Sequence, residues 1–105
     1  MSDGAGPGNA GEVKEHVKEK VSEPEMFQVV LHNDDYTTME FVVEVLMGVF
    51  HRTIIDATRI MLDVHRKGRG VVGTYTYDIA STKVNTVRDM ARRREFPLRC
   101  TIEPA

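Results

Sequence analysis

The sequence is short of cysteine, of long apolar runs and of net charge, and each shortage removes a class of protein. Its single cysteine, Cys100, excludes an internal disulfide. No apolar stretch approaches the roughly 20 residues that span a membrane, and no apolar signal-peptide core stands at the N-terminus. The net charge of -2 gives no global attraction to nucleic acid or to an anionic membrane. These observations predict a cytoplasmic protein with neither nucleic acid nor membrane as a partner.

The chain of 105 residues has room for one domain, and its composition changes near residue 25. Small residues and proline fill positions 1–11, and residues 12–25 form a Glu/Lys run with only three valines as apolar residues. Such a segment buries too little apolar surface to offset its ordering entropy. We therefore predict a flexible N-terminal extension of residues 1–25 and a folded domain of residues 26–105.

The apolar pattern of the folded domain predicts the order βααβαβ. Alternation of apolar and polar residues indicates strands at 27–32 and 98–103, with Val30 on the polar side of the first, and a Val/Thr/Tyr-rich strand at 70–76 in which Gly73 marks a bulge or a close approach. Helical periodicity indicates helices at 38–50, 53–67 and 77–93. The buried stripes expected on these helices are Met39, Val42, Val43, Leu46, Met47 and Phe50; Ile54, Ala57, Thr58, Met61, Val64 and His65; and Ile79, Ala80, Val84, Val87 and Ala91. The fold class is α+β, with three helices on one face of a small, three-stranded, mostly antiparallel sheet.

A polar run, residues 32–37, separates the first strand from the first helix. Thr37 and Glu40 have the spacing of a capping box, which predicts Thr37 as the N-cap and Tyr36 and Phe41 as a hydrophobic staple. Asn33, Asp34 and Asp35 are three oxygen-bearing side chains where one would make an Asx-turn. A solvated turn with a cap and a binding site both remain open readings of this run.

Catalytic and metal-binding readings of the polar residues have little support. Asp34 and Asp35 with His32 or His65 would be the acid/base candidates, but adjacent turn residues point in different directions and no activated nucleophile accompanies them. There is no cysteine pair, no HxxxH and no calcium-loop spacing. The arginines at 92–94 are explained by the helix dipole. The sequence predicts no enzyme, no metal and no cofactor.

A binding pocket fits the residues better. The apolar positions Met39, Val42, Met61 and Val64 are expected to share one end with Asn33, Asp34 and His65. Apolar walls with hydrogen-bond acceptors at the rim suit a small apolar group that carries a cation.

These residues resemble the ClpS family. The resemblance is carried by Asn33-Asp34-Asp35-Tyr36-Thr37, Met39-Glu40-Phe41-Val42, Met61-Leu62-Asp63-Val64-His65, Gly68, Gly73, Ala80, Thr82-Lys83-Val84 and Pro97-Leu98. It implies an adaptor that delivers N-end-rule substrates to the ClpAP protease, with a core similar to the C-terminal domain of the ribosomal stalk protein. It also implies substrates that begin with Leu, Phe, Tyr or Trp.

The resemblance also implies a role for each site residue. Asn33, Asp34 and His65 would hold the substrate α-amino group, and Asp35 and Thr37 the first peptide unit. The pocket for the first side chain would be lined by Met39, Val42, Met61, Val64 and Leu98, with Met39 as a gate against β-branched residues.

A second implied surface would bind the N-terminal domain of the ClpA unfoldase. Tyr36, Asp78 and Lys83 occupy the matching positions, with Thr76 and Thr82 close by, and residues 1–25 resemble the extension that the unfoldase engages. Thr38 and Asp78 depart from the family's usual proline and glutamate. A module serving another machine, or an inhibitor that only occupies the unfoldase, stays open as the alternative.

Overall fold

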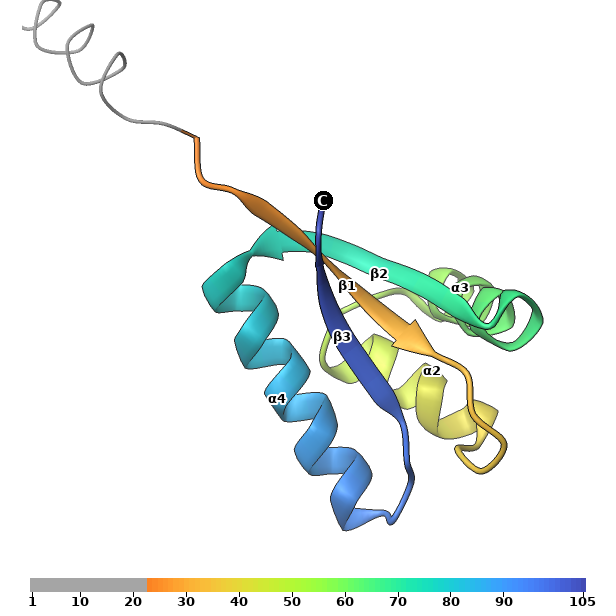
Figure 1. Ribbon diagram of the computed structural model, residues 1–105. Helices are drawn as coiled ribbons and strands as arrows, with labels where there is room; N and C mark the ends of the chain where they lie inside the picture. The colour runs from red at the N-terminus through yellow and green to blue at the C-terminus, as the bar shows by residue number, and fades with distance from the viewer. Residues whose placement is uncertain (1–22) are drawn as a thin grey trace, which may run out of the picture.

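The computed structural model describes residues 23–105; residues 1–22, and with them most of the predicted extension 1–25, lie outside the described residues. The elements follow in the order β1 (Met26–His32), α2 (Met39–Gly48), α3 (Ile54–Lys67), β2 (Arg69–Thr76), α4 (Tyr77–Arg93) and β3 (Arg99–Pro104) (Figure 1). The predicted βααβαβ order is therefore confirmed.

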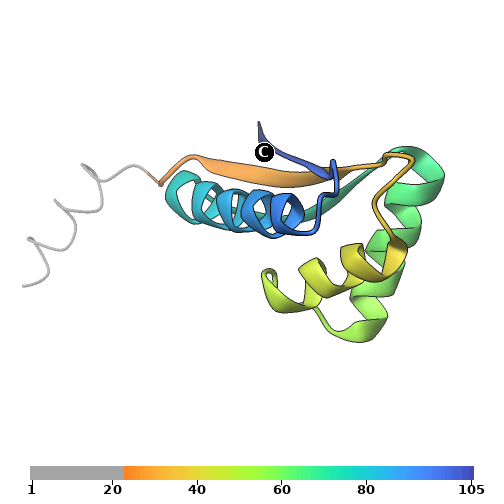
Figure 2. The same ribbon diagram turned by 90° about the horizontal axis from the view of Figure 1, so that it is seen from below.

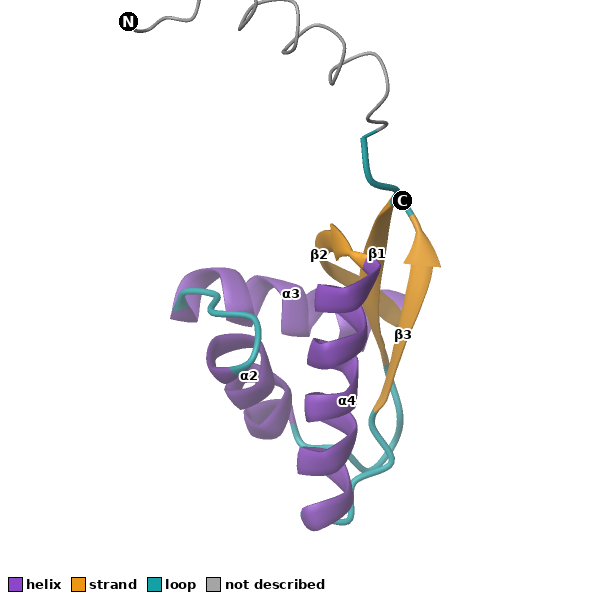
Figure 3. Cartoon of the chain, turned by 90° about the vertical axis from the view of Figure 1, so that its left-hand side faces the viewer, coloured by secondary structure: helices purple, strands orange, loops and turns teal. Residues whose placement is uncertain are grey.

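The sheet has the strand order β2-β1-β3, with β1 antiparallel to both neighbours. Figures 2 and 3 show α2, α3 and α4 together on one side of this sheet. The predicted α+β fold is confirmed, and all strand pairs are antiparallel. In residues 23–105, no helix combines the length and the apolar character that crossing a membrane requires.

The central strand is more buried than simple alternation predicts. Val29 and Leu31 enter the core beneath the helices, but Val30 is also fully buried. In the sheet register Val30 lies between Val71 of β2 and Thr101 of β3. A small side chain between two neighbouring strands is covered by their side chains, so the polar-side placement of Val30 did not leave it exposed.

The buried face of each helix differs in part from the predicted stripe. On α2, Phe41 and Val45 are fully buried, whereas Met39 and Met47 are 42% and 40% exposed. Ile60 is buried on α3 in place of Ile54, which is 54% exposed, and Ile79 of α4 is 49% exposed. The burial of Phe41 on α2 has a visible cause. Its ring packs against the ring of Phe96, a residue beyond the end of α4, and the two ring centroids lie 5.0 Å apart.

The first helix is capped one residue later than predicted. The Thr38 hydroxyl accepts a hydrogen bond from the Phe41 amide at 3.1 Å, so Thr38 is the N-cap. The predicted capping box of Thr37 with Glu40 is wrong, and so is the staple, because the Tyr36 side chain is 76% exposed. The caps of α3 agree with prediction: Thr53 accepts from the Asp56 amide, and Gly68 closes the helix with φ 89°.

Two glycines of β2 mark close approaches. A Cβ on Gly70 would lie 2.8 Å from the Val64 Cγ2 atom, so β2 packs against α3 with no room for a side chain. The register of β1 against β2 shifts between Val29 and Val30, next to Gly73. This confirms the predicted irregularity at Gly73, where a Cβ would also collide with the Arg52 guanidinium.

Candidate functional site

The turn between β1 and α2 is built around the Asp34 carboxylate. Its Oδ1 accepts hydrogen bonds from the amides of Tyr36 and Thr37 at 2.8 and 2.7 Å, and its Oδ2 accepts one from the Thr37 hydroxyl at 2.7 Å. A carboxylate has about four acceptor directions, so the turn leaves about one for a ligand. Thr37 is thereby committed to the turn, which explains why Thr38 caps the helix.

A backbone hydrogen bond fixes this turn over the end of α3. The Asn33 amide donates to the Gly68 carbonyl at 2.9 Å. His65 lies in the last turn of α3 and is exposed. Two segments about thirty residues apart in sequence thus present their polar side chains at one place.

Beneath the turn lies a cavity of about 230 Å³. It is lined by Asn33, Asp34, Asp35, Thr37, Met39, Val42, Met61, Val64 and His65. The structure therefore brings together every predicted pocket residue except Leu98. That side chain is 7% exposed, belongs to the core and faces a different hollow between α4 and β3.

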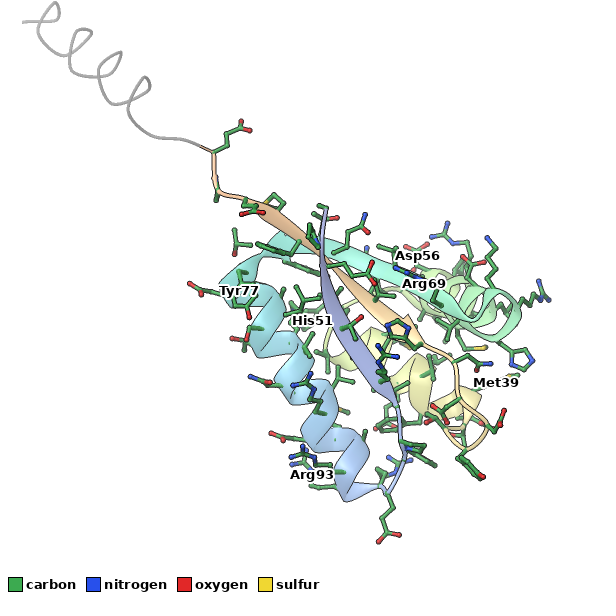
Figure 4. All side chains as sticks on the ribbon, viewed as in Figure 1. Met39, His51, Asp56, Arg69, Tyr77 and Arg93 are labelled. Atoms are coloured by element: carbon green, nitrogen blue, oxygen red, sulfur yellow. The ribbon has the colours of Figure 1, made fainter. Side chains whose placement is uncertain are left out.

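The polar and apolar parts of the cavity come from different elements. Met39 and Val42 project from α2, Met61 and Val64 from α3, and the turn supplies the oxygen atoms (Met39 is labelled in Figure 4). The walls can bury an apolar group, and the rim can accept hydrogen bonds from a cation.

The electrostatics of the rim favour a cation. Desolvation raises the pKa of Asp34, but the hydrogen bonds from Thr37 and Tyr36 outweigh it, so the pKa of this carboxyl lies below its ordinary value. Asp34 is consequently ionised at neutral pH. A negative charge held by the turn therefore stands at the rim of the cavity.

The predicted second surface is divided in the structure. Asp78 lies in the first turn of α4, and Lys83 lies about one and a half turns further along. Tyr36 instead lines a hollow at the other end of that helix, with Arg92, Phe96 and Pro97. Asp78 and Arg92 are separated by about 21 Å along the helix axis, at about 1.5 Å per residue. The structure therefore does not bring Tyr36 together with Asp78 and Lys83.

Lys83 is held more firmly than a solvated lysine. Its ammonium donates to the Val49 carbonyl at 2.8 Å and lies 5.7 and 5.6 Å from the ring centroids of Phe50 and Tyr75. It therefore connects α4 to the loop after α2.

Two arginines make contacts that the sequence did not predict: Arg52 was not singled out, and Arg94 was explained by the helix dipole alone. Arg52 donates to the Val72 carbonyl at the β2 irregularity. Arg94 lies over the Phe41 ring at 5.0 Å, beside Glu44 at 3.4 Å. Neither contact has a local sequence signal, because each joins residues at least 20 positions apart. Among residues 23–105, no group of three or more His, Cys, Asp or Glu side chains is placed to hold a metal ion.

Comparison with known proteins supports one family. Residues 22–101 match the family model described as ATP-dependent Clp protease adaptor protein ClpS. The chain is 63% identical over 86 residues to the ATP-dependent Clp protease adapter protein ClpS of Syntrophus aciditrophicus, covering 82% of this chain and 80% of that one. Against the ClpS of Acetivibrio thermocellus the identity is 61% over 92 residues, covering 88% and 93%.

A solved structure with the same fold gives a further comparison. It is described as Agrobacterium tumefaciens ClpS2 bound to L-phenylalaninamide, and it matches with a TM-score of 0.76 and 41% identity over 79% of this chain and 100% of that one. Sequence model, relatives and fold agree, and the chain belongs to the ClpS family of ATP-dependent Clp protease adaptor proteins.

Proposed function

We propose that this adaptor binds proteins whose first residue is bulky and hydrophobic and delivers them to the ClpA unfoldase of the ClpAP protease. The observation that carries the proposal is the cavity under the turn, which combines apolar walls with a rim of acceptors. A free polypeptide N-terminus beginning with Leu, Phe, Tyr or Trp has the matching chemistry: an apolar side chain beside an ammonium group.

Each part of the cavity has a role in this proposal. Asn33, Asp34 and His65 accept hydrogen bonds from the α-ammonium group, with His65 in its neutral form, while Asp35 and Thr37 contact the first peptide unit. Met39, Val42, Met61 and Val64 enclose the first side chain. Met39, at the start of α2 and 42% exposed, stands at the entrance and acts against β-branched residues.

The energetics are adequate for a transient adaptor. Burying a Leu or Phe side chain contributes about 1.5–3 kcal/mol. Each hydrogen bond between a charged donor and the rim adds about 1.5–3 kcal/mol. After the costs of association, these contributions support dissociation constants near the micromolar range.

The ligand of the related solved structure supports the same chemistry. L-phenylalaninamide carries a free α-amino group, a benzyl side chain and an amide in place of the next peptide unit. A relative with 41% identity and the same fold thus binds a molecule that reproduces the first residue of a polypeptide.

For the unfoldase we assign the first half of α4. Asp78 and Lys83 lie there, with Thr76 and Thr82 between and beside them, and this half is remote from the cavity. Tyr36 lies on the turn at the opposite end of α4 and is left out of this assignment. Separate surfaces allow substrate and unfoldase to bind at the same time, as delivery requires.

The proposal is tested by fluorescence anisotropy with two labelled peptides, one beginning with free Leu and the other with acetylated Leu. Acetylation removes the positive charge and adds bulk where the acceptors converge. We expect dissociation constants near the micromolar range for the free peptide and no measurable binding of the acetylated one. Equal binding of both, or of neither, would reduce Asn33, Asp34 and His65 to residues of a solvated turn.

A further inference from the structure

A second and larger hollow lies between the C-terminal half of α4 and β3. It has a volume of about 430 Å³ and is lined by Arg88 and Arg92 of α4 and by residues 98–101, which include Arg99. Ala91, Phe96 and Pro97 complete its lining, and no acidic side chain is among the residues that line it. We call this hollow the arginine groove.

The groove follows the free edge of the sheet. β3 pairs with β1 on one side only, because the strand order is β2-β1-β3. On one face of β3, Leu98 and Cys100 point to the core. On the opposite face, Arg99 and Thr101 lie with His32 of β1. The four residues 98–101 all line the groove. A hollow bordered by both faces of an edge strand lies along its unpaired edge, where backbone groups remain available to an extended chain.

The arginines of the groove are not neutralised by the domain itself. Within residues 23–105, the ion pairs are made by Arg59, Lys67, Arg69 and Arg94, and by none of the three groove arginines. Burial raises the pKa of the Cys100 thiol to about 12, so this side chain brings no negative charge. An occupant with carboxylates has complementary charge.

The arginine groove extends to the outer side of the turn that covers the cavity. Tyr36, on the outer side of the turn, lines a shallow hollow with Arg92, Glu95, Phe96 and Pro97. Three of these residues, Arg92, Phe96 and Pro97, also line the arginine groove. This shallow hollow is largely apolar and has one carboxylate, Glu95, so it suits neutral residues, whereas the arginine groove next to it suits acidic ones.

We propose that the arginine groove binds an extended acidic segment of the substrate, several residues after the N-terminal residue that enters the cavity. This inference rests on the proposed function and adds a specificity to it: substrates with carboxylates at the right distance bind more tightly. The first residue is required for binding, and the later acidic segment increases the affinity.

The test compares peptides that begin with free Leu and are otherwise neutral, except for four consecutive Glu or four consecutive Gln. The block is moved along the peptide, and anisotropy is measured at about 50 mM and about 500 mM salt. We expect Glu to improve affinity about three- to tenfold over Gln in one window of positions, and the gain to vanish at the higher salt.

A matched pair of variants assigns the gain to the groove. Arg88→Gln removes a charge from the groove, and Arg93→Gln removes the same charge from the same exposed helix end outside it (Arg93 is labelled in Figure 4). The gain should fall by at least half in Arg88→Gln and persist in Arg93→Gln. Both variants should bind the Gln peptide as the parent does.

The outcomes separate the inference from the function beneath it. If the Gln peptides do not bind, the proposed function fails. If they bind and Glu gives no gain in any window, the arginine groove is not a substrate site. An acetylated Glu peptide that binds as well as the free one, or a single-stranded oligonucleotide that displaces the Glu peptide more strongly than an acidic peptide does, would also overturn the inference in favour of an independent anion site.

Discussion

At the scale of single residues, Asp34 both holds the turn and charges the rim of the cavity. Its three hydrogen bonds to Tyr36 and Thr37 would form with or without a ligand. Loss of peptide binding in an alanine variant would therefore not distinguish the two roles. The charge has to be removed while the turn is kept.

We predict that Asp34→Asn separates them. Its amide oxygen can still accept from the two backbone amides, so stability should fall by less than about 1.5 kcal/mol. The affinity for a peptide beginning with Leu should fall about tenfold or more, because a charged acceptor is lost. Asp34→Ala should reduce both the stability, measured by urea unfolding, and the peptide affinity, measured by anisotropy. Unchanged affinity in Asp34→Asn would leave this carboxylate with the turn alone.

His32 provides a residue-scale prediction about pH. Burial lowers the pKa of His32 from 6.5, and Arg99 and Arg69 lower it further, against a smaller opposite effect of Glu103. The unfolded chain therefore takes up the proton at higher pH than the folded chain. This contribution to stability is intact above pH 6.5 and declines as the pH falls below that value.

The measurement is the urea midpoint between pH 7.5 and 5 for the parent and for His32→Gln. The variant can keep a hydrogen bond to Thr101, whose hydroxyl lies 2.7 Å from His32 Nε2. We expect its midpoint to vary less with pH than that of the parent. Parallel curves for the two proteins would show that His32 is not linked to folding.

At the scale of whole elements, the sequence predicted which segments are helices and strands better than which face each helix buries. Periodicity is a local property, and Thr53 and Gly68 supply local caps, so α3 was placed within a residue. Phe41 is buried because it meets Phe96 and Arg94, more than 50 positions away. No local pattern contains that contact.

The turn of the site is held by local hydrogen bonds, whereas the lining of its cavity was predicted from the resemblance to the ClpS family. Asp34, Tyr36 and Thr37 form one turn, and Asn33 contacts Gly68 at the end of α3. Leu98 is the one predicted lining residue that the structure places at another hollow. Its surroundings depend on how α4 packs on β3, which the sequence does not display.

The contact between β2 and α3 carries an element-scale prediction about the size of the cavity. A Cβ on Gly70 would lie 2.8 Å from Val64 Cγ2, and Val64 lines the cavity. Gly70→Ala should push Val64 towards the cavity and destabilise the fold by about 1–3 kcal/mol. Affinity should fall more for a first residue of Trp or Phe than for Leu, measured by anisotropy on the folded fraction.

Gly48→Ala is the control for this prediction. Gly48 ends α2, has nothing within 4 Å of an added Cβ and does not line the cavity. Alanine there should raise stability by about 0.5–1 kcal/mol without changing the order of first-residue preferences. An equal loss for Leu, Phe and Trp in Gly70→Ala would mean that the wall of the cavity does not move.

At the scale of the whole molecule, substrate binding and delivery should be separable. The cavity, the turn and the first half of α4 all lie within residues 23–105, so this part contains both surfaces that we assign to binding. The described residues that line the cavity all lie between Asn33 and His65, apart in sequence from residues 1–22. Their small and charged composition suits a segment that another protein engages as an extended chain.

We therefore predict that deleting residues 1–22 leaves both binding affinities intact, because neither assigned surface is altered. The affinity for a peptide beginning with Leu should stay within about twofold of that of the full chain, and the affinity for the ClpA N-terminal domain should be unchanged. Degradation of a Leu-initiated reporter by ClpAP should nevertheless fail, because the unfoldase has lost the segment that it engages. The truncated protein should also compete with the full chain and inhibit its delivery. If the truncated chain delivers normally, hand-off depends on the folded domain alone; if it loses peptide affinity, residues 1–22 belong to the binding site, and the division between binding and delivery is wrong.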